Sequence, residues 1–185
     1  VIGQMMEKVV LPPMKPRRTE EEIAKECPWA ANGHGLKQRG VNVITSLELD
    51  PAKMEEKNHK LQEKYRQIKE NEVRYETKDL EDAELAIVAF GSAARISQKA
   101  IEIAREQGIK VGLFRPITLW PFPQEEIAEL SKKLKGILVV EINAGQMVYD
   151  VRYAVEGRVP VKHYGRLGGI VPDPDEIIEV LKQLD

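Results

Sequence analysis

The sequence predicts an α/β fold, a mostly parallel sheet with helices on both faces, preceded by an extended linker and a long helix. Three observations support this prediction. From residue 79 onward, four short apolar runs alternate with four amphipathic stretches, which is typical of parallel strands joined by right-handed helical crossovers. The first run, Leu85–Phe90, is apolar throughout, as expected for a strand buried on both faces. Residues 1–78 show no such alternation and carry several prolines.

Residues 1–78 are predicted to hold the tail of a preceding domain and a linker with a long charged helix, and residues 79–185 the α/β domain. Three closely spaced prolines favour an extended tether over residues 9–16, because proline disfavours helix in the residue before it. Thr19 is followed by three glutamates, so a short helix is expected to begin there with a capping box.

Two further elements are expected before the α/β domain. Val41–Thr45 predicts a strand, and residues 52–72 predict one long helix that is charged over most of its surface. The apolar stripe of this helix is sparse and consists of Met54, Leu61, Tyr65 and Ile68. Burial of its own side chains cannot stabilise such a helix, so it must lie across another surface, in this domain or in a partner.

Turn residues separate the strands and helices of the α/β domain. Gly91-Ser92 ends the first strand, and Gly108 ends the helix that follows, since glycine readily adopts the left-handed conformation common after a helix. The expected strands are 85–90, 111–114, 137–140 and 159–164, and the expected helices are 96–107, 124–134, 146–155 and 174–184.

Composition excludes several classes of protein. The chain has 185 residues, 42% of them hydrophobic, and a net charge of −2, so it is neither disordered throughout nor basic enough to bind nucleic acid. No apolar run reaches the ~18 residues of a membrane span. Cys27 is the only cysteine, which excludes an internal disulfide, an iron–sulfur cluster and a cysteine-based zinc site. A reducing, cytoplasmic setting is therefore expected. The three histidines, His34, His59 and His163, have no metal-ligand spacing.

Ligands of open α/β sheets bind beyond the carboxyl ends of the strands, so four loops are candidates for function. In Gly91–Arg95, Ser92 is expected to be a helix N-cap; the alternative is that free amides of the helix hold an anion. Arg115–Pro123 contains three prolines and two aromatic residues, which fix its shape at little entropic cost. An exposed Trp120 or Phe122 would anchor an interface; the alternative is that the loop packs its aromatic residues under its own domain.

The other two loops follow the third and fourth strands. Glu141–Gln146 places a carboxylate and two amides, those of Asn143 and Gln146, between a strand and a helix. These groups either bind a ligand or tie the loop to its neighbours, and no general acid–base pair accompanies them. In Tyr164–Pro174, Arg166 either meets an acidic ligand group or a carboxylate of a partner.

Three motifs occur in order along the α/β domain: Arg115–Pro123, Val139–Gln146 and Tyr164–Gly169. Together they resemble the C-terminal domain of the alpha subunit of the 2-oxoacid:ferredoxin oxidoreductases. The resemblance covers essentially the whole chain and implies a transketolase C-terminal-like fold. Thr45–Asp50 is also similar to a Thr-Gly-x-Glu-His-Asp stretch of the family, although Ser46 and Leu49 replace its glycine and its histidine.

The resemblance implies oxidative decarboxylation of a 2-oxoacid, with 2-oxoglutarate favoured, to an acyl-CoA and CO2, with electrons passed to ferredoxin. Thiamine diphosphate, Mg²⁺ and iron–sulfur clusters are implied for the intact complex, with coenzyme A as co-substrate and none of the cofactors held by this segment. The implied partners are a beta subunit, with gamma or delta subunits in some complexes, and ferredoxin. Because the chain begins at Val1, it is expected to be the distal half of a larger subunit, inactive in isolation.

Within such a complex, this segment is expected to be structural, to dock against the catalytic domains or to shape the approach of coenzyme A. The expected contact residues, none of them catalytic, are Ser92, Arg95, Arg115, Trp120, Glu141, Asn143, Gln146 and Arg166. Two other classes stay open. One is the C-terminal domain of a transketolase or of an oxoacid dehydrogenase beta chain. The other is a stand-alone anion- or nucleotide-binding module in which Gly91–Arg95 holds a phosphate.

Overall fold

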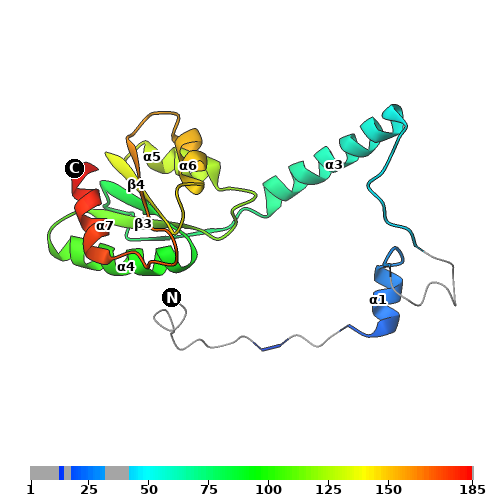
Figure 1. Ribbon diagram of the computed structural model, residues 1–185, viewed down its shortest axis with the longest axis horizontal. Helices are drawn as coiled ribbons and strands as arrows, with labels where there is room; N and C mark the ends of the chain where they lie inside the picture. Colours follow the sequence, from blue (N-terminus) through cyan, green and yellow to red (C-terminus); the bar gives the residue numbers. More distant parts are fainter. Residues whose placement is uncertain (1–12, 15–17, 32–41, 185) are drawn as a thin grey trace. The chain divides into compact units, whose positions relative to one another are not determined.

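A five-stranded sheet forms the centre of the α/β domain in the computed structural model (Figure 1), which describes residues 13–14, 18–31 and 42–184. The strands are β1 (Tyr75–Lys78), β2 (Leu85–Val88), β3 (Val111–Pro116), β4 (Gly136–Glu141) and β5 (Val161–Gly165), in the order β1-β3-β2-β4-β5. β2 to β5 are parallel, and β1 pairs antiparallel with β3 at one edge. The predicted α/β fold, with a mostly parallel sheet, is confirmed.

Helices cover both faces of this sheet. The helices of the domain are α4 (Gly91–Glu106), α5 (Gln124–Ser131), α6 (Met147–Val155) and α7 (Pro174–Leu181), followed by a 3-10 turn, η2 (Lys182–Leu184). Figure 1 shows α4 and α7 on one face and α5 and α6 on the other, and each pair packs together. Two apolar clusters result, one beneath each helix pair, because the central strands β2, β3 and β4 are buried on both faces.

β1 was not expected from the sequence. All four of its side chains are exposed, so Tyr75–Lys78 lacks the apolar run that marks the other strands. Its residues precede position 79, the expected start of the α/β domain, yet they pair with β3 in the sheet. α4 also begins at Gly91, five residues before the expected start at Ile96. The expected strand at 41–45 is wrong, because residues 42–45 have no strand structure; Val41 lies outside the described residues.

The predicted helices before the domain are confirmed. α1 (Glu20–Glu26) begins with the capping box expected at Thr19, whose hydroxyl accepts from the Glu22 backbone while Glu22 accepts from the Thr19 backbone. The long helix is α3 (Pro51–Asn71). Most of the expected tether at 9–16 and all of His34 lie outside the described residues. The described residues from Glu63 onward form one compact unit, and those before it form another.

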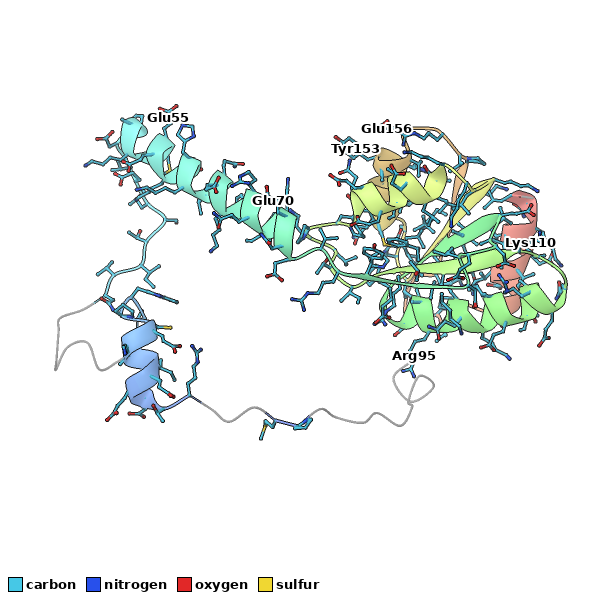
Figure 2. All side chains as sticks on the ribbon, turned by 180° about the vertical axis from the view of Figure 1, so that it is seen from behind. Glu55, Glu70, Arg95, Lys110, Tyr153 and Glu156 are labelled. Carbon is cyan, nitrogen blue, oxygen red and sulfur yellow. The ribbon has the colours of Figure 1, made fainter. Side chains whose placement is uncertain are left out.

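α3 contains no buried residue, and Figure 2 shows charged side chains, Glu55 and Glu70 among them, projecting from it. Pairs one turn apart connect these charges. Arg66 lies 2.7 Å from a carboxylate oxygen of Glu63 and 2.5 Å from one of Glu70. Pairs at this spacing stabilise a helix only weakly. Because no residue of α3 is buried, tertiary packing also adds little to its stability.

Candidate functional site

The carboxyl ends of β2 and β4 lie side by side near the middle of the sheet, and the helices that follow them leave to opposite faces. α4 follows β2 on one face, and α6 follows β4 on the other. In open α/β sheets, ligands bind at such a reversal, beyond the carboxyl ends of the strands. The loop after β4 is therefore the part of the candidate site with the strongest topological support.

Glu141 ends β4 and organises this loop. Its side chain is 1% exposed, yet its carboxylate accepts hydrogen bonds from the backbone N–H groups of Gln146, Met147 and Val148, at 3.2, 2.8 and 3.2 Å. These are amides of the first turn of α6, whose N-cap residue makes no side-chain cap of its own. Glu141 thus satisfies the free amides of the helix and places a negative charge at the positive end of its dipole.

Asn143 ties the same loop to Glu141. Its Nδ2 donates to Glu141 Oε1 at 3.1 Å, and its Oδ1 accepts from the Gly145 N–H at 2.7 Å. Gly145 has a φ of +107°, a conformation open mainly to glycine. Gln146 contributes its backbone N–H, and the residue itself is exposed. Of the two alternatives for this loop, the structure shows side chains tying it to its neighbours.

His163 on β5 lies beside Glu141 and Asn143, although nothing in its sequence context marked it as part of a site. Its Nε2 lies 3.5 Å from Glu141 Oε2 and, within the described part of the chain, has no hydrogen-bond partner although it is buried. The parallel register of β4 with β5, which pairs Glu141 with Gly165, brings the two side chains together. A Cβ on Gly165 would lie 2.3 Å from the Asn143 carbonyl oxygen, so only glycine permits this approach.

Charge around Glu141 affects the first turn of α6. Desolvation, and secondarily the Glu141 carboxylate, raise the pKa of Asp150 above its usual value. The Glu141 lone pairs are occupied by backbone and amide donors. Such a carboxylate is suited to holding a loop in place, and a general base needs a free lone pair toward its substrate.

Arg115 lies on β3, and Trp120 lies in the loop that follows this strand. Arg115 is paired with Glu76 of β1, at 2.7 Å. The Trp120 side chain is 54% exposed and meets Tyr65 of α3 edge-on, with ring centroids 5.6 Å apart. Phe122, by contrast, packs against the apolar cluster under α5 and α6. The loop therefore divides its two aromatic residues, one packed under its own domain and one left exposed.

Ser92 and Arg95 lie on the first turns of α4. The prediction that Ser92 is the N-cap is wrong: the N-cap is Phe90, and no side chain caps the helix. Because the chain enters the helix at Gly91, directly after the strand, Ser92 already lies inside the first turn. Arg95 is half-buried one turn further along, and Figure 2 shows its side chain projecting from α4 on the side away from the sheet.

Arg166 pairs inside the domain. Its Nη1 lies 2.9 Å from Glu176 Oε2 on α7, and the hydroxyl of Tyr164 donates to the same carboxylate. Burial, together with this hydrogen bond, raises the pKa of Tyr164. The Arg166 backbone N–H also donates to the Glu141 carbonyl oxygen at 3.3 Å. The predicted contact residues thus fall into a connected group around Glu141 and separate groups at Arg115 and Ser92.

No group of three or more His, Cys, Asp or Glu side chains in a metal-binding arrangement occurs among the described residues. With a single cysteine in the sequence, the chain does not fit an iron–sulfur cluster, which takes several thiolate ligands. In the described ranges no helix is long and apolar enough to cross a bilayer.

Named relatives match the chain over all or part of its length. It is 40% identical over 187 residues to the ketoisovalerate oxidoreductase subunit VorB of Methanothermobacter thermautotrophicus, an alignment that covers 100% of this chain and 50% of the relative. It is 36% identical over 98 residues to the 2-oxoglutarate synthase subunit KorA of Methanothermobacter marburgensis, covering 53% of this chain and 26% of that subunit. The chain thus spans half the length of the relative that it matches in full.

Solved structures share the fold. A 2-oxoglutarate:ferredoxin oxidoreductase from Magnetococcus marinus, with 2-oxoglutarate, coenzyme A and succinyl-CoA bound, superposes with a TM-score of 0.65 at 21% identity, over 84% of this chain and 28% of that one. A split-gene transketolase superposes with a TM-score of 0.52 at 17% identity, over 60% of this chain and 41% of that one. The predicted transketolase C-terminal-like fold is confirmed.

Residues 83–177, slightly more than half of the chain, match the family described as pyruvate:ferredoxin oxidoreductase core domain II. The matched range runs from just before β2 into α7 and contains Glu141, Asn143 and His163. The resemblance of the three motifs is therefore confirmed, and the chain belongs to the 2-oxoacid:ferredoxin oxidoreductase family, with the core domain II fold.

Proposed function

We propose that this chain is the C-terminal half of the alpha subunit of a thiamine-diphosphate-dependent 2-oxoacid:ferredoxin oxidoreductase. The observation that carries the proposal is the 40% identity to VorB along the full chain, which includes α1, α3 and the α/β domain. The proposed reaction converts a 2-oxoacid and coenzyme A into an acyl-CoA and CO2, while two electrons pass to ferredoxin. Thiamine diphosphate and Mg²⁺ would supply the decarboxylation chemistry in the remainder of the enzyme, with iron–sulfur clusters in other subunits.

The role proposed for this half is docking. Glu141 fixes the loop after β4 and, through the backbone of Arg166, the start of the loop after β5. These loops leave apolar side chains in solvent: Ile142 is 37% exposed, Leu167 58% and Ile170 52%. Rigid apolar loops at the ligand-binding edge of a sheet support a surface that packs against a catalytic domain or the coenzyme A path.

A branched-chain 2-oxoacid is the substrate that we propose first. The VorB relative is named for ketoisovalerate and is 40% identical along 100% of this chain, whereas the KorA relatives that align along 96% and 98% of it, named for 2-oxoglutarate, are 28% identical. Because of this difference, we rank the branched-chain acid above 2-oxoglutarate, which the resemblance of the motifs favoured. 2-Oxoglutarate stays as the second candidate.

The test is an assay of the complete subunit, purified with the subunits encoded beside it. Ferredoxin reduction with coenzyme A is measured for 3-methyl-2-oxobutanoate, 2-oxoglutarate and pyruvate at limiting concentrations. The branched-chain acid is expected to give the highest kcat/KM. A preference for 2-oxoglutarate would support the second candidate, and failure of every 2-oxoacid to reduce ferredoxin would contradict the proposed function.

A further inference from the structure

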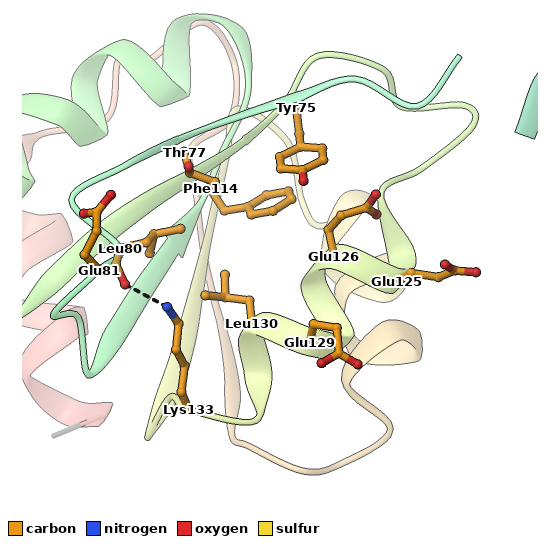
Figure 3. A pocket seen from close by; sticks show the side chains of 10 residues that line it. All are labelled: Tyr75, Thr77, Leu80, Glu81, Phe114, Glu125, Glu126, Glu129, Leu130 and Lys133. Atoms are coloured by element: carbon orange, nitrogen blue, oxygen red, sulfur yellow. Dashed lines mark hydrogen bonds between the residues drawn. The ribbon is translucent and has the colours of Figure 1, made fainter. Parts of the chain in front are cut away.

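A groove of about 630 Å³ lies at the β1 end of the sheet, on the face that α5 and α6 cover (Figure 3). Tyr75 and Thr77 reach this face because they stand opposite Pro116 and Phe114 in the antiparallel register of β1 and β3. α5 forms the facing wall, and it leaves this end of the strands uncovered.

The floor of the groove is apolar. Phe114 is 2% exposed, and the ring of Tyr75 stacks on it with centroids 5.0 Å apart and an interplanar angle of 11°. Leu80 and Leu130 complete the floor and are almost fully buried. Tyr75 itself is 41% exposed, so the ring that covers the core is itself open to solvent. Tyrosine is enriched at the centre of protein interfaces, where its ring is buried on association.

The rim of the groove is acidic. Four carboxylates line it, those of Glu81, Glu125, Glu126 and Glu129. The one ammonium group in the lining is that of Lys133, and it donates to the Leu80 carbonyl oxygen at 3.0 Å. The groove therefore presents a concentration of negative charge around an apolar floor, which attracts a positively charged partner.

Stabilisation of α5 explains the positions of only some of these four glutamates. Glu125 and Glu126 lie in the first turn of α5, where carboxylates interact favourably with the helix dipole, and neither has an ion pair in the part of the chain that the structure describes. Glu129 lies in the second turn, paired with Lys132 at 2.5 Å. Glu81 comes from the turn between β1 and β2, so the rim combines charges from two separate elements.

The groove borders an edge strand of the sheet. β1 ends the sheet, and its four residues are exposed. An edge strand offers backbone N–H and C=O groups to a chain that lies alongside it. A small molecule would use the pocket alone, whereas an extended polypeptide segment would use the floor, the rim and the edge together.

We propose that this groove binds a segment of another subunit of the same enzyme, one that presents apolar side chains flanked by Lys or Arg. The inference rests on the proposed function, which makes the chain part of a complex, and it names the chemistry of the partner segment. Charge complementarity with the four glutamates selects the basic residues, and the open ring of Tyr75 selects the apolar ones.

Site-specific crosslinking in the complete enzyme tests this proposal. The photoreactive residue p-benzoylphenylalanine is introduced in place of Tyr75, and in place of Tyr153, which is 70% exposed on α6, as the matched control. The Tyr75 position is expected to crosslink to a peptide of another subunit that contains apolar residues and at least two Lys or Arg. Crosslinks to a second copy of this chain, to an acidic or uncharged peptide, or to nothing would overturn the inference.

A charge reversal tests the role of the rim. Glu125→Lys combined with Glu129→Lys is expected to weaken subunit association at least tenfold at low salt, while Glu102→Lys combined with Glu106→Lys on α4 leaves it unchanged. Equal association of both double variants would overturn the inference. Circular dichroism of the purified variants establishes that both fold. If the complex assembles and reduces ferredoxin while the groove stays uncovered, this inference fails alone; if no complex forms, the proposed function fails with it.

Discussion

α3 and the end of β4 use carboxylates in opposite ways. In α3, Glu63 and Glu70 pair with Arg66 in solvent, and the helix has no buried residue. At the end of β4, Glu141 is buried and accepts from the backbone amides of the N-cap residue and the first two residues of α6. Exposed ion pairs contribute little and are screened by salt, whereas removing the acceptor of buried donors is costly. The loop after β4 is therefore fixed by buried hydrogen bonds within its own domain, whereas the charges of α3 are paired only along its exposed surface.

The largest effect is expected at Glu141. Glu141→Gln replaces one acceptor oxygen with an amide that faces backbone N–H donors, so the free energy of unfolding should fall by about 3 kcal/mol. Urea denaturation followed by tryptophan fluorescence and circular dichroism measures the change. Glu102→Gln on the exposed face of α4 is the control and should change little. Equal stability of the two variants would mean that Glu141 does not anchor α6.

The next effect concerns the close approach of β5 to the loop after β4. Gly165→Ala puts a Cβ 2.3 Å from the Asn143 carbonyl oxygen, and the backbone shift that follows should destabilise the domain by about 2 kcal/mol. Gly136→Ala is the control, because the nearest neighbours of its Cβ would be side-chain atoms of Leu184, the closest at 3.1 Å, rather than backbone atoms. The same denaturation experiment compares them, and a smaller loss for Gly165→Ala than for the control would contradict the packing argument.

A smaller effect is expected from acid on α3. Hydrogen bonds from Arg66 and Gln67 lower the pKa of Glu63 from 4.5 to about 2. A carboxyl with a lowered pKa stabilises the folded helix above its ordinary pKa, and that contribution is lost as the pH falls toward 2. Carboxyl carbon chemical shifts should place the Glu63 midpoint well below 4.5, and Arg66→Ala should return it toward 4.5. An unchanged midpoint in the variant would refute the pairing.

The smallest effect is expected from salt. At 1 M NaCl the exposed pairs of α3, such as Lys60 with Glu56 at 2.7 Å, are screened within a few ångström. Helical circular dichroism of a peptide of residues 48–72 should fall slightly, while the Tm of the α/β domain holds. A fall in the domain Tm with no change in the peptide would reverse the comparison between the two regions.

Most of the sheet could be predicted from the sequence because burial on both faces leaves continuous apolar runs, as in Leu85–Val88. β1 could not, since its side chains are exposed and its pairing depends on the distant β3. The expected strand at 41–45 failed for the opposite reason: Val43 and Ile44 are apolar, but they are exposed and pair with no strand. An apolar run thus predicts a strand only when a partner strand is available.

The candidate site was only partly predictable. Glu141, Asn143 and Gln146 are close in sequence, and their polar character after an apolar run marked them. His163 and Gly165 join them through the register of β4 with β5, which no local pattern encodes. Ser92 shows the converse error, because a good capping residue does not set the start of a helix when the preceding glycine lets the chain turn earlier.

The Glu141 anchor has a consequence for how this surface can evolve. Three of the groups it holds are backbone amides, which every residue other than proline supplies. The side chains of Ile142, Ala144 and Gln146 point outward from a loop whose path does not depend on them. Substitutions at these exposed positions can therefore change the chemistry of the surface that the loop presents, while the backbone hydrogen bonds to Glu141 are retained.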